Sequence, residues 1–488
     1  MTGRQEDAAR AARPGSDRIT PKGPEVILTD AVVITMDDER RAFARGFVWL
    51  KDGRIHRVGP MSELGSVPPN VTRRSFERHI IMPGLVNCHT HLGNGVLRGI
   101  YDEMPLEVWF AKGMWPVLDS MSARAAAAGT FLSGLELLST GVTTTASGEI
   151  CTPRRESMDG VMTALQTLGM RAVVSRIVMD SADDSSPAQF IPEAFRETPE
   201  QATDELLRLQ RDYNSDRLSV VPEALGVLRC TPEMIQAMHA LAVRTGSHFT
   251  MHVASSQDER DESRARFGHG SVSELERLGV LGPKTLLAHT IWLDDDEIAC
   301  LAERQTGISH NPVANAYYAA GVARLAELLD KGVRVGLGVD GASTNNSQNV
   351  WETMKMAMLF QKQRLERASF GGAELALELM TRGGAAALHM EDEIGSLETG
   401  KRADVIVIDA SRLPIAPWQT ALSNLVYSND PWAVREVYVD GELLISDGRH
   451  RSVKLAEVLG EAEWALGDIL KKTGLDQYLE TRSRWKWQ

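Results

Sequence analysis

Residues 82–91 read MPGLVNCHTH, a short apolar run that ends in two histidines, His89 and His91, separated by one residue. Such a run, with Pro-Gly near its start and polar residues at its end, is typical of a buried β-strand. Side chains two positions apart on an extended segment point to the same side. The two imidazoles can therefore bind one metal ion, although a single His-x-His pair is weak evidence without further context.

Seven more apolar runs follow this one and alternate with longer amphipathic stretches. One such stretch, residues 232–246, begins after Thr231 with Pro-Glu and ends at glycine, as helices do. The seven predicted strands are VTTTAS (142–147), RAVVSRIV (171–178), LSVVPEAL (218–225), HFTMHVA (248–254), TLLAHT (285–290), GISHNP (307–312) and VRVGLGVD (333–340). Eight strands alternating with helices predict an α/β fold, a (β/α)₈ TIM-type barrel, over residues 82–390. The pattern alone leaves a doubly wound open sheet as the alternative.

The two ends of the chain have a different pattern. Residues 25–81 and 391–450 are rich in short β-type segments broken by Asp-Gly and Gly turns. They predict one small composite β-sandwich domain built from both termini. Residues 1–24 have the composition of a polar tail, and residues 451–488 are predicted to form a C-terminal helical tail.

Charge and cysteine content exclude several classes of function. The chain has 53 basic and 66 acidic residues, a net charge of −13, which disfavours nonspecific binding to nucleic acid or an anionic membrane. The four cysteines are far apart, so we expect no disulfide scaffold and a reducing compartment, the cytoplasm. The chain has no apolar run of transmembrane length and no signal-peptide core.

Polar residues capable of binding metal end several of the later strands. They are His252, His289 and Asp340, with His310 between the last two, and they are spaced by roughly one βα unit. In a barrel these strand ends converge on one face, where the active site lies. Three histidines and an aspartate around an open position suit zinc or a similar divalent ion.

Several segments together resemble the amidohydrolase superfamily, in particular the branch of S-adenosylhomocysteine and methylthioadenosine deaminases, guanine deaminase and triazine hydrolases. The resemblance extends over residues 25–450. The matching segments are PGLVNCHTHLGNGVLRG (83–99), DEMPLEVWF (102–110), HTIWLDDDE (289–297), SHNPVANAYYAAGVA (309–323), GLGVDGASTNNSQNVWETMKMA (336–357) and EDEIGSLETGKRADVIVID (391–409).

The resemblance implies the barrel with its terminal β-sandwich and a metal-dependent hydrolase of carbon–nitrogen bonds. It assigns the metal ligands as His89, His91, His252 and Asp340, and it assigns His289 to the attacking water. In such a site a divalent ion lowers the pKa of water toward neutrality. Asp340 then collects a proton and passes it to the leaving amine. Relatives are commonly dimers or larger, so we expect a homo-oligomer that acts on a small molecule.

Ser255 marks one departure from the family pattern. Deaminases of this branch carry a glutamate three residues after the histidine of the fifth strand, where this chain has Ser255. A serine hydroxyl cannot replace a carboxylic acid as a proton donor near neutral pH. This change puts deamination of a purine or triazine ring in doubt.

Glu223 marks a second departure, because it occupies the position of a substrate-contacting histidine after the fourth strand. It could be a relocated general acid. It could instead bridge two metals, in which case His252 and His289 would serve the second ion. A structural role is the third alternative, with Glu223 capping the chain or pairing with Arg229.

These departures favour amides, ureas and carbamates, whose hydrolysis needs no ring protonation. The alternative is an aminohydrolase or hydrolytic dehalogenase of an N-heterocycle. A catalytically inactive relative used for binding is disfavoured by the intact set of ligands. Candidate substrate-binding residues are Trp109, Trp115, Ser255, Asn311 and Asn315.

Overall fold

The computed structural model describes residues 23–102, 109–151, 153–183, 190–428 and 430–482. The predicted polar tail of residues 1–24 lies almost wholly outside these ranges. So do residues 483–488 of the C-terminal segment and residues 103–108 of the DEMPLEVWF motif. Among the helices that the structure describes, none is long and apolar enough to cross a membrane.

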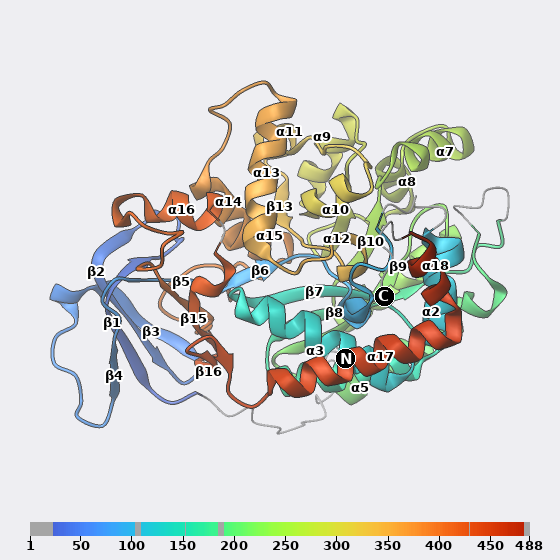
Figure 1. Cartoon of the computed structure of the whole chain (residues 1–488). Helices are drawn as coiled ribbons and strands as arrows, with labels where there is room; N and C mark the ends of the chain where they lie inside the picture. Colours follow the sequence, from blue (N-terminus) through green and yellow to red (C-terminus); the bar gives the residue numbers. More distant parts are fainter. Residues whose placement is uncertain (1–22, 103–108, 152, 184–189, 429, 483–488) are drawn as a thin grey trace, which may run out of the picture.

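An eight-stranded parallel sheet forms the centre of the molecule (Figure 1), and its strands follow one another in chain order. They are β6 (Leu85–Asn87), β7 (Val142–Ile150), β8 (Arg171–Val178), β9 (Leu218–Ala224), β10 (Phe249–Val253), β11 (Thr285–His289), β12 (Gly307–His310) and β13 (Arg334–Leu337). The backbone N–H of Cys88 donates to the carbonyl of Leu337 at 2.9 Å, which links the first strand to the last. The sheet is therefore a nearly closed barrel, and the predicted fold is confirmed.

Helices cover the outside of the barrel between successive strands. Helix α6 shows why they form where they do: Thr231 caps its first turn, Pro232 follows, and Gly246 ends it at a φ of 67°. The helices between the strands are α2 (Trp115–Ser120), α3 (Ala123–Ser139), α4 (Glu156–Leu168), α5 (Pro199–Tyr213), α6 (Pro232–Thr245), α7 (Gln257–Phe267), α8 (Ser271–Leu278), α9 (Asp295–Arg304), α10 (Pro312–Tyr317) and α11 (Leu325–Asp330). Those that follow the last barrel strand are α12 (Ala342–Asn345), α13 (Val350–Arg364), α14 (Ala373–Met380), α15 (Arg382–Ala387), α16 (Ala421–Tyr427), α17 (Leu455–Thr473) and α18 (Leu475–Arg482).

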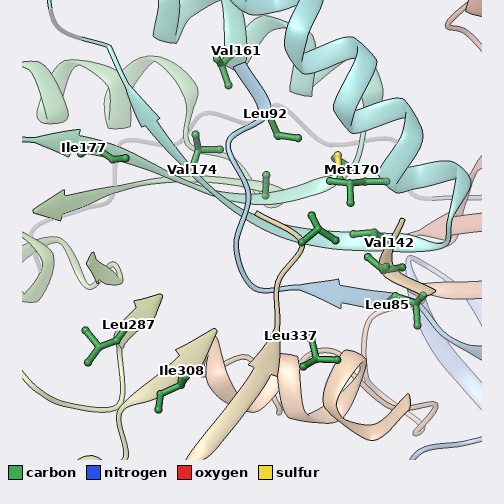
Figure 2. Packing of buried hydrophobic residues seen from close by; sticks show 14 of the residues in the cluster. Leu85, Leu92, Val142, Val161, Met170, Val174, Ile177, Leu287, Ile308 and Leu337 are labelled. Atoms are coloured by element: carbon green, nitrogen blue, oxygen red, sulfur yellow. The ribbon is translucent and has the colours of Figure 1, made fainter. Parts of the chain in front are cut away.

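One continuous apolar core joins the strands to the helices. Val142, Leu287 and Leu337 from the strands lie in the same buried cluster as Val161 of α4. Figure 2 shows part of this packing. Burial of this apolar surface provides the main favourable free energy that holds the helices against the barrel.

A second sheet, with nine strands, is built from both ends of the chain and lies beside the barrel (Figure 1). Its strands are β1 (Val26–Ile34), β2 (Ala42–Lys51), β3 (Arg54–Pro60), β4 (Thr72–Ser75), β5 (His79–Pro83), β14 (Val405–Asp409), β15 (Val434–Val439), β16 (Glu442–Ser446) and β17 (Arg449–His450). Antiparallel pairing of β5 with β14 joins the N-terminal strands to the C-terminal ones. The composite β domain predicted from the termini is confirmed, while its residue limits and those of the tails remain predictions.

Residues 80–88, IIMPGLVNC, which include most of the first predicted strand, are divided between the two sheets rather than forming one strand. Strand β5 ends at Pro83 in the nine-stranded sheet, and β6 begins at Leu85 in the barrel. A Cβ atom on the intervening Gly84 would lie 2.1 Å from Thr143 Oγ1. The close approach of the backbone to β7 thus requires glycine at this crossing.

A buried ionic network ties the barrel to the nine-stranded sheet. Nη2 of Arg171, at the start of β8, lies 2.7 Å from Asp440 Oδ1 and 3.3 Å from Asp404 Oδ1. Asp440 also lies 3.0 Å from Arg217 Nε and 3.0 Å from Arg402 Nη1. Burial would raise the pKa of Asp440, but Arg171 and Arg402 lower it overall. The guanidinium of Arg171 and the carboxylates therefore depend on each other for charge balance.

Replacing Arg171 by alanine removes positive charge that balances the carboxylates of Asp404 and Asp440 in a buried environment. Loss of one partner from a buried ion pair costs about 3–5 kcal/mol, and we expect a decrease of that size in the free energy of unfolding, measured by chemical denaturation. Arg40→Ala is the matched control. The Arg40 side chain of the Arg40–Glu378 pair is exposed, so the pair should contribute little to the free energy of unfolding. Equal stability of Arg171→Ala and the wild type would contradict this role for the network.

Candidate metal centre

Four imidazoles and one carboxylate meet at the carboxyl ends of the barrel strands. His89 and His91 follow β6, His252 lies in β10, His289 ends β11, and Asp340 follows β13. The ring centroid of His89 lies 4.8 Å from that of His91 and 4.8 Å from that of His252. Two sets of three, His89–His91–His252 and His89–His289–Asp340, have potential ligand atoms within 4.8 Å of one another. The barrel thus brings together all five predicted metal-site residues.

The carboxylate of Asp340 faces three of the rings. Its Oδ1 lies 3.5 Å from His91 Nε2 and 3.8 Å from His89 Nε2, and its Oδ2 lies 3.8 Å from His289 Nε2. The Nε2 atom of His89 is buried without a hydrogen-bond partner among the described residues. A buried imidazole nitrogen in this position is explained by a cation, since imidazole and carboxylate together are ligands for zinc and similar ions.

The opposite nitrogen of three rings is engaged by a neighbouring group. His91 Nδ1 donates to the carbonyl oxygen of Gly148. His289 Nδ1 lies 2.9 Å from Asn315 Oδ1, and His252 Nδ1 lies 2.8 Å from Glu223 Oε1. An acceptor at Nδ1 places the ring proton there and leaves the Nε2 lone pair for a metal.

The pKa shifts of His89, His289 and Asp340 suit the binding of a cation. Burial lowers the pKa of His89 well below its usual value, and the three neighbouring histidines lower it further. Burial also lowers the pKa of His289. For Asp340, burial acts to raise the pKa, but His91, His289 and the N–H of Gly341 lower it overall. Neutral imidazoles and an ionised carboxylate are the forms that bind divalent metals.

The backbone is strained at two residues of the cluster. His289 has a φ of 75° and Asp340 a φ of 66°, in the left-handed region that side chains with a Cβ rarely adopt. Ala254, two residues after His252, has a φ of 51°. Such strain persists only where the surrounding structure imposes it, and it occurs frequently at functional sites.

Glu223 contacts His252 instead of pairing with Arg229. Its carboxylate accepts from Ser175 Oγ and from Thr250 Oγ1, the latter at 2.9 Å, and it contacts His252. Burial acts to raise the pKa of Glu223, but contact with His252 lowers it overall, so the group is ionised. The guanidinium of Arg229 lies over the Phe110 ring at 4.5 Å. The geometry thus places Glu223 against His252, a contact that the sequence did not suggest.

A cavity of about 850 Å³, including its mouth, opens next to the cluster. Apolar side chains form much of its wall, and Asn94, Arg229, Tyr318 and Thr344 also contribute to it. The apolar residues among those that line it are Trp109, Phe110, Met114, Ile150, Ile177, Leu225, Ala314 and Ala320. A mainly apolar wall with a few polar side chains is typical of a site for a small molecule.

Three of the five predicted substrate-binding residues line this cavity: Trp109, Ser255 and Asn315. The other two lie outside its lining. Trp115 is packed in the core, with its ring 4.9 Å from that of Phe195. Asn311 is buried beside His289, with Nδ2 at 3.3 Å from the Nδ1 atom of that ring. Helical spacing could not distinguish a pocket-facing tryptophan from a core one.

Glu259 was missed by the sequence analysis. It lies on α7, and its Oε2 accepts from Ser255 Oγ at 2.7 Å. Ser256 and Glu259 have the spacing of a capping box, Ser-x-x-Glu, and Ser256 Oγ does accept from Glu259 N at 3.1 Å. That spacing could have placed Glu259 next to the end of β10.

Glu149, at the end of β7, was also missed. Its carboxylate accepts from Ser147 Oγ at 2.6 Å and lies 3.2 Å from the N–H of Gly93, in the turn that follows His91. Burial raises its pKa. A glutamate in a buried strand gave no signal in the sequence, because the contact with Gly93 comes from a different strand end.

Comparison with known proteins finds a matching family model and several relatives. Residues 80–444 match the model of the amidohydrolase family. The 5′-deoxyadenosine deaminase of Methanothermobacter thermautotrophicus is 32% identical over 425 residues, which cover 87% of this chain and 95% of the relative. The 5-methylthioadenosine/S-adenosylhomocysteine deaminase of Pelotomaculum thermopropionicum is 32% identical over 448 residues, which cover 90% and 97%.

Solved structures share the fold at lower sequence identity. A zinc-bound adenosine deaminase from Xanthomonas campestris superposes with a TM-score of 0.85 at 24% identity, covering 92% of this chain and 100% of that one. The atrazine chlorohydrolase of Arthrobacter aurescens, complexed with zinc, has a TM-score of 0.84 at 22% identity, covering 90% and 100%. These similarities support the barrel with its terminal β domain.

Glu223→Gln should weaken binding of a divalent metal. The amide cannot supply the negative charge that orients the His252 ring, and loss of such a partner typically costs about 10–100-fold in metal affinity. Affinity for Zn²⁺ is measured by competition with a chromophoric chelator. Ser175→Ala is the control, because it removes one donor to Glu223 but leaves the contact with His252, and its effect should be much smaller. Equal zinc affinity in Glu223→Gln and the wild type would contradict this role.

Proposed function

The chain belongs to the amidohydrolase family, and we propose that it hydrolyses the carbon–nitrogen bond of a small amide, urea or carbamate with the help of one divalent metal. Its relatives of about 30% identity are hydrolases of carbon–nitrogen bonds by name. The choice of substrate rests on the residues that line the cavity. Among the described residues that line it, Asp340 is the one carboxylate.

Zinc is the metal we propose, held by His89, His91, His252 and Asp340. The buried Nε2 atom of His89 and the ionised state of Asp340 support this assignment, and two zinc-bound structures share the fold. The ion, when bound, lowers the pKa of water so that hydroxide is available near neutral pH. One ion is preferred to two because Glu223, the alternative bridging ligand, already contacts His252 and Ser175.

Asp340 and His289 have different roles in this proposal: His289 orients the water, and Asp340 transfers the proton. His289 orients the attacking water through Nε2, with its Nδ1 held against Asn315. Asp340 accepts a proton from that water as the oxygen bonds to the carbonyl carbon. When the carbon–nitrogen bond breaks, Asp340 returns the proton to the leaving nitrogen. The products are an amine, or ammonia, together with a carboxylic acid from an amide, a carbamic acid from a urea, or a carbonic monoester from a carbamate.

Amides, ureas and carbamates fit this site because one proton carrier is enough for them. Attack on a ring carbon of a purine or triazine requires a second acid to protonate a ring nitrogen. Ser255 stands where relatives carry that acid, and its hydroxyl hydrogen is donated to Glu259. The apolar wall formed by Trp109 and Phe110 favours a substrate with an aromatic or alkyl substituent.

Ring deamination is the second candidate function, and hydrolytic dehalogenation of an N-heterocycle belongs with it. The names of the relatives support it, since several of about 30% identity are deaminases of 5′-deoxyadenosine or methylthioadenosine. A homo-oligomer in the cytoplasm, with no nucleic acid or membrane partner, remains the expectation from composition and resemblance.

Asp340→Asn should reduce kcat/KM by at least about a hundredfold, because the amide cannot carry the proton from water to the leaving nitrogen. Zinc content is measured in the same preparations, since Asp340 is also a proposed ligand. A variant that retains zinc but loses activity separates proton transfer from metal binding. Full activity in Asp340→Asn would contradict the mechanism.

A substrate panel of anilides, phenylureas, carbamates and amino-heterocycles distinguishes the two candidate functions. We expect the zinc-loaded enzyme to release an amine from members of the first three groups, and dialysis against a chelator to abolish that activity reversibly. The panel includes 5′-deoxyadenosine, with ammonia as the product measured. Ammonia release from 5′-deoxyadenosine without hydrolysis of any amide, urea or carbamate would favour the deaminase.

A further inference from the structure

Ser255 is placed to contact substrate, because it lines the cavity directly after β10, three residues beyond His252. The orientation of its hydroxyl is fixed by a neighbouring residue. The Oγ atom donates its hydrogen to Glu259 Oε2 at 2.7 Å. A hydroxyl has one hydrogen and two lone pairs, so the remaining hydrogen-bonding capacity of Ser255 is that of an acceptor.

Glu259 is held so that this orientation persists. Its Oε1 accepts from Ala254 N at 2.7 Å and from Ser271 Oγ at 3.1 Å. Its Oε2 accepts from Ser255 N at 2.8 Å in addition to the hydroxyl. An ionised carboxylate has no hydrogen to donate, so Glu259 cannot reverse the direction of its bond with Ser255. The two backbone N–H groups also fix the carboxylate in place.

We propose that Ser255 acts as a hydrogen-bond acceptor for the substrate and selects substrates that present an N–H group beside the scissile carbon. This inference rests on the proposed function and narrows its substrate class to amides, ureas and carbamates that keep a hydrogen on nitrogen. A substrate with a methyl group in place of that hydrogen leaves the Ser255 lone pairs without a donor and crowds the hydroxyl.

The direction of this hydrogen bond is opposite to the one that a carboxylic acid would make. An acid at this position donates to a nitrogen lone pair, whereas Ser255 accepts from an N–H. The Ser255–Glu259 pair therefore discriminates against a bare ring nitrogen and in favour of an amide or urea N–H. Specificity of this kind arises because a polar group of the binding site that is covered by the substrate without gaining a partner costs free energy.

Matched substrate pairs test the proposal in the zinc-loaded enzyme. Acetanilide is compared with N-methylacetanilide, and 1,1-dimethyl-3-phenylurea with 1,1,3-trimethyl-3-phenylurea, by release of the aniline or of N-methylaniline. The quantity measured is the ratio of kcat/KM for the N–H member to that for the N-methyl member. Dividing the wild-type ratio by that of Ser255→Ala removes the difference in intrinsic reactivity within each pair.

We expect the wild-type ratio to exceed the Ser255→Ala ratio by roughly tenfold, the size typical of one hydrogen bond. Ser255→Thr retains a hydroxyl and should retain the preference. Glu259→Gln no longer fixes the orientation of the Ser255 hydroxyl and should reduce the preference for the N–H substrate. Ser271→Ala is the matched control, because it removes another donor to Glu259 and leaves the Ser255 contact in place. Thermal unfolding and zinc content show that each variant is folded and loaded.

Two results would overturn the proposal in distinguishable ways. Equal ratios in the wild type and Ser255→Ala, with hydrolysis observed in both, would overturn the role of Ser255 and leave the proposed function intact. Absence of hydrolysis of either member of every pair by zinc-loaded wild type would overturn the proposed function, and this inference with it.

Discussion

Closure of the parallel barrel is the constraint on which the site depends. The N–H of Cys88 donates to the carbonyl of Leu337, and the N–H of Asp340 donates to the carbonyl of His89. These bonds join the first strand to the last, although some 250 residues separate their sequences. Because all eight strands run in the same direction, their carboxyl ends meet on one face. His89 and His252, from different strands, thereby become neighbours with ring centroids 4.8 Å apart.

A second layer of polar groups controls what the clustered imidazoles can do. Asn315, Glu223 and the carbonyl of Gly148 each occupy the Nδ1 side of one ring, so the Nε2 atoms face a common centre. Their effect is chemical as well as geometric, because they determine which nitrogen carries the proton. The same principle recurs at the cavity wall, where Glu259 determines the direction of the Ser255 hydrogen bond.

Sequence reasoning identified the strands and singled out the candidate ligands because both depend on local patterns. Apolar runs and helix caps are read within a window of ten to twenty residues, and His89, His252 and Asp340 each follow such a run directly. It did not predict the contact of Glu223 with His252 or the position of Trp115 in the core. Those depend on which side of a strand or helix faces a partner distant in sequence.

The sequence by itself determined the eight-stranded barrel, the terminal β domain and the identity of the polar residues at the strand ends. It also determined the family, through motifs spread over most of the chain. Only the tertiary structure decided how those residues work together: that Glu223 serves a histidine, and that Ser255 gives its hydrogen to Glu259. The physical reason is that hydrogen-bond direction and protonation depend on the full three-dimensional set of neighbours, whereas strand and helix formation depends on local composition.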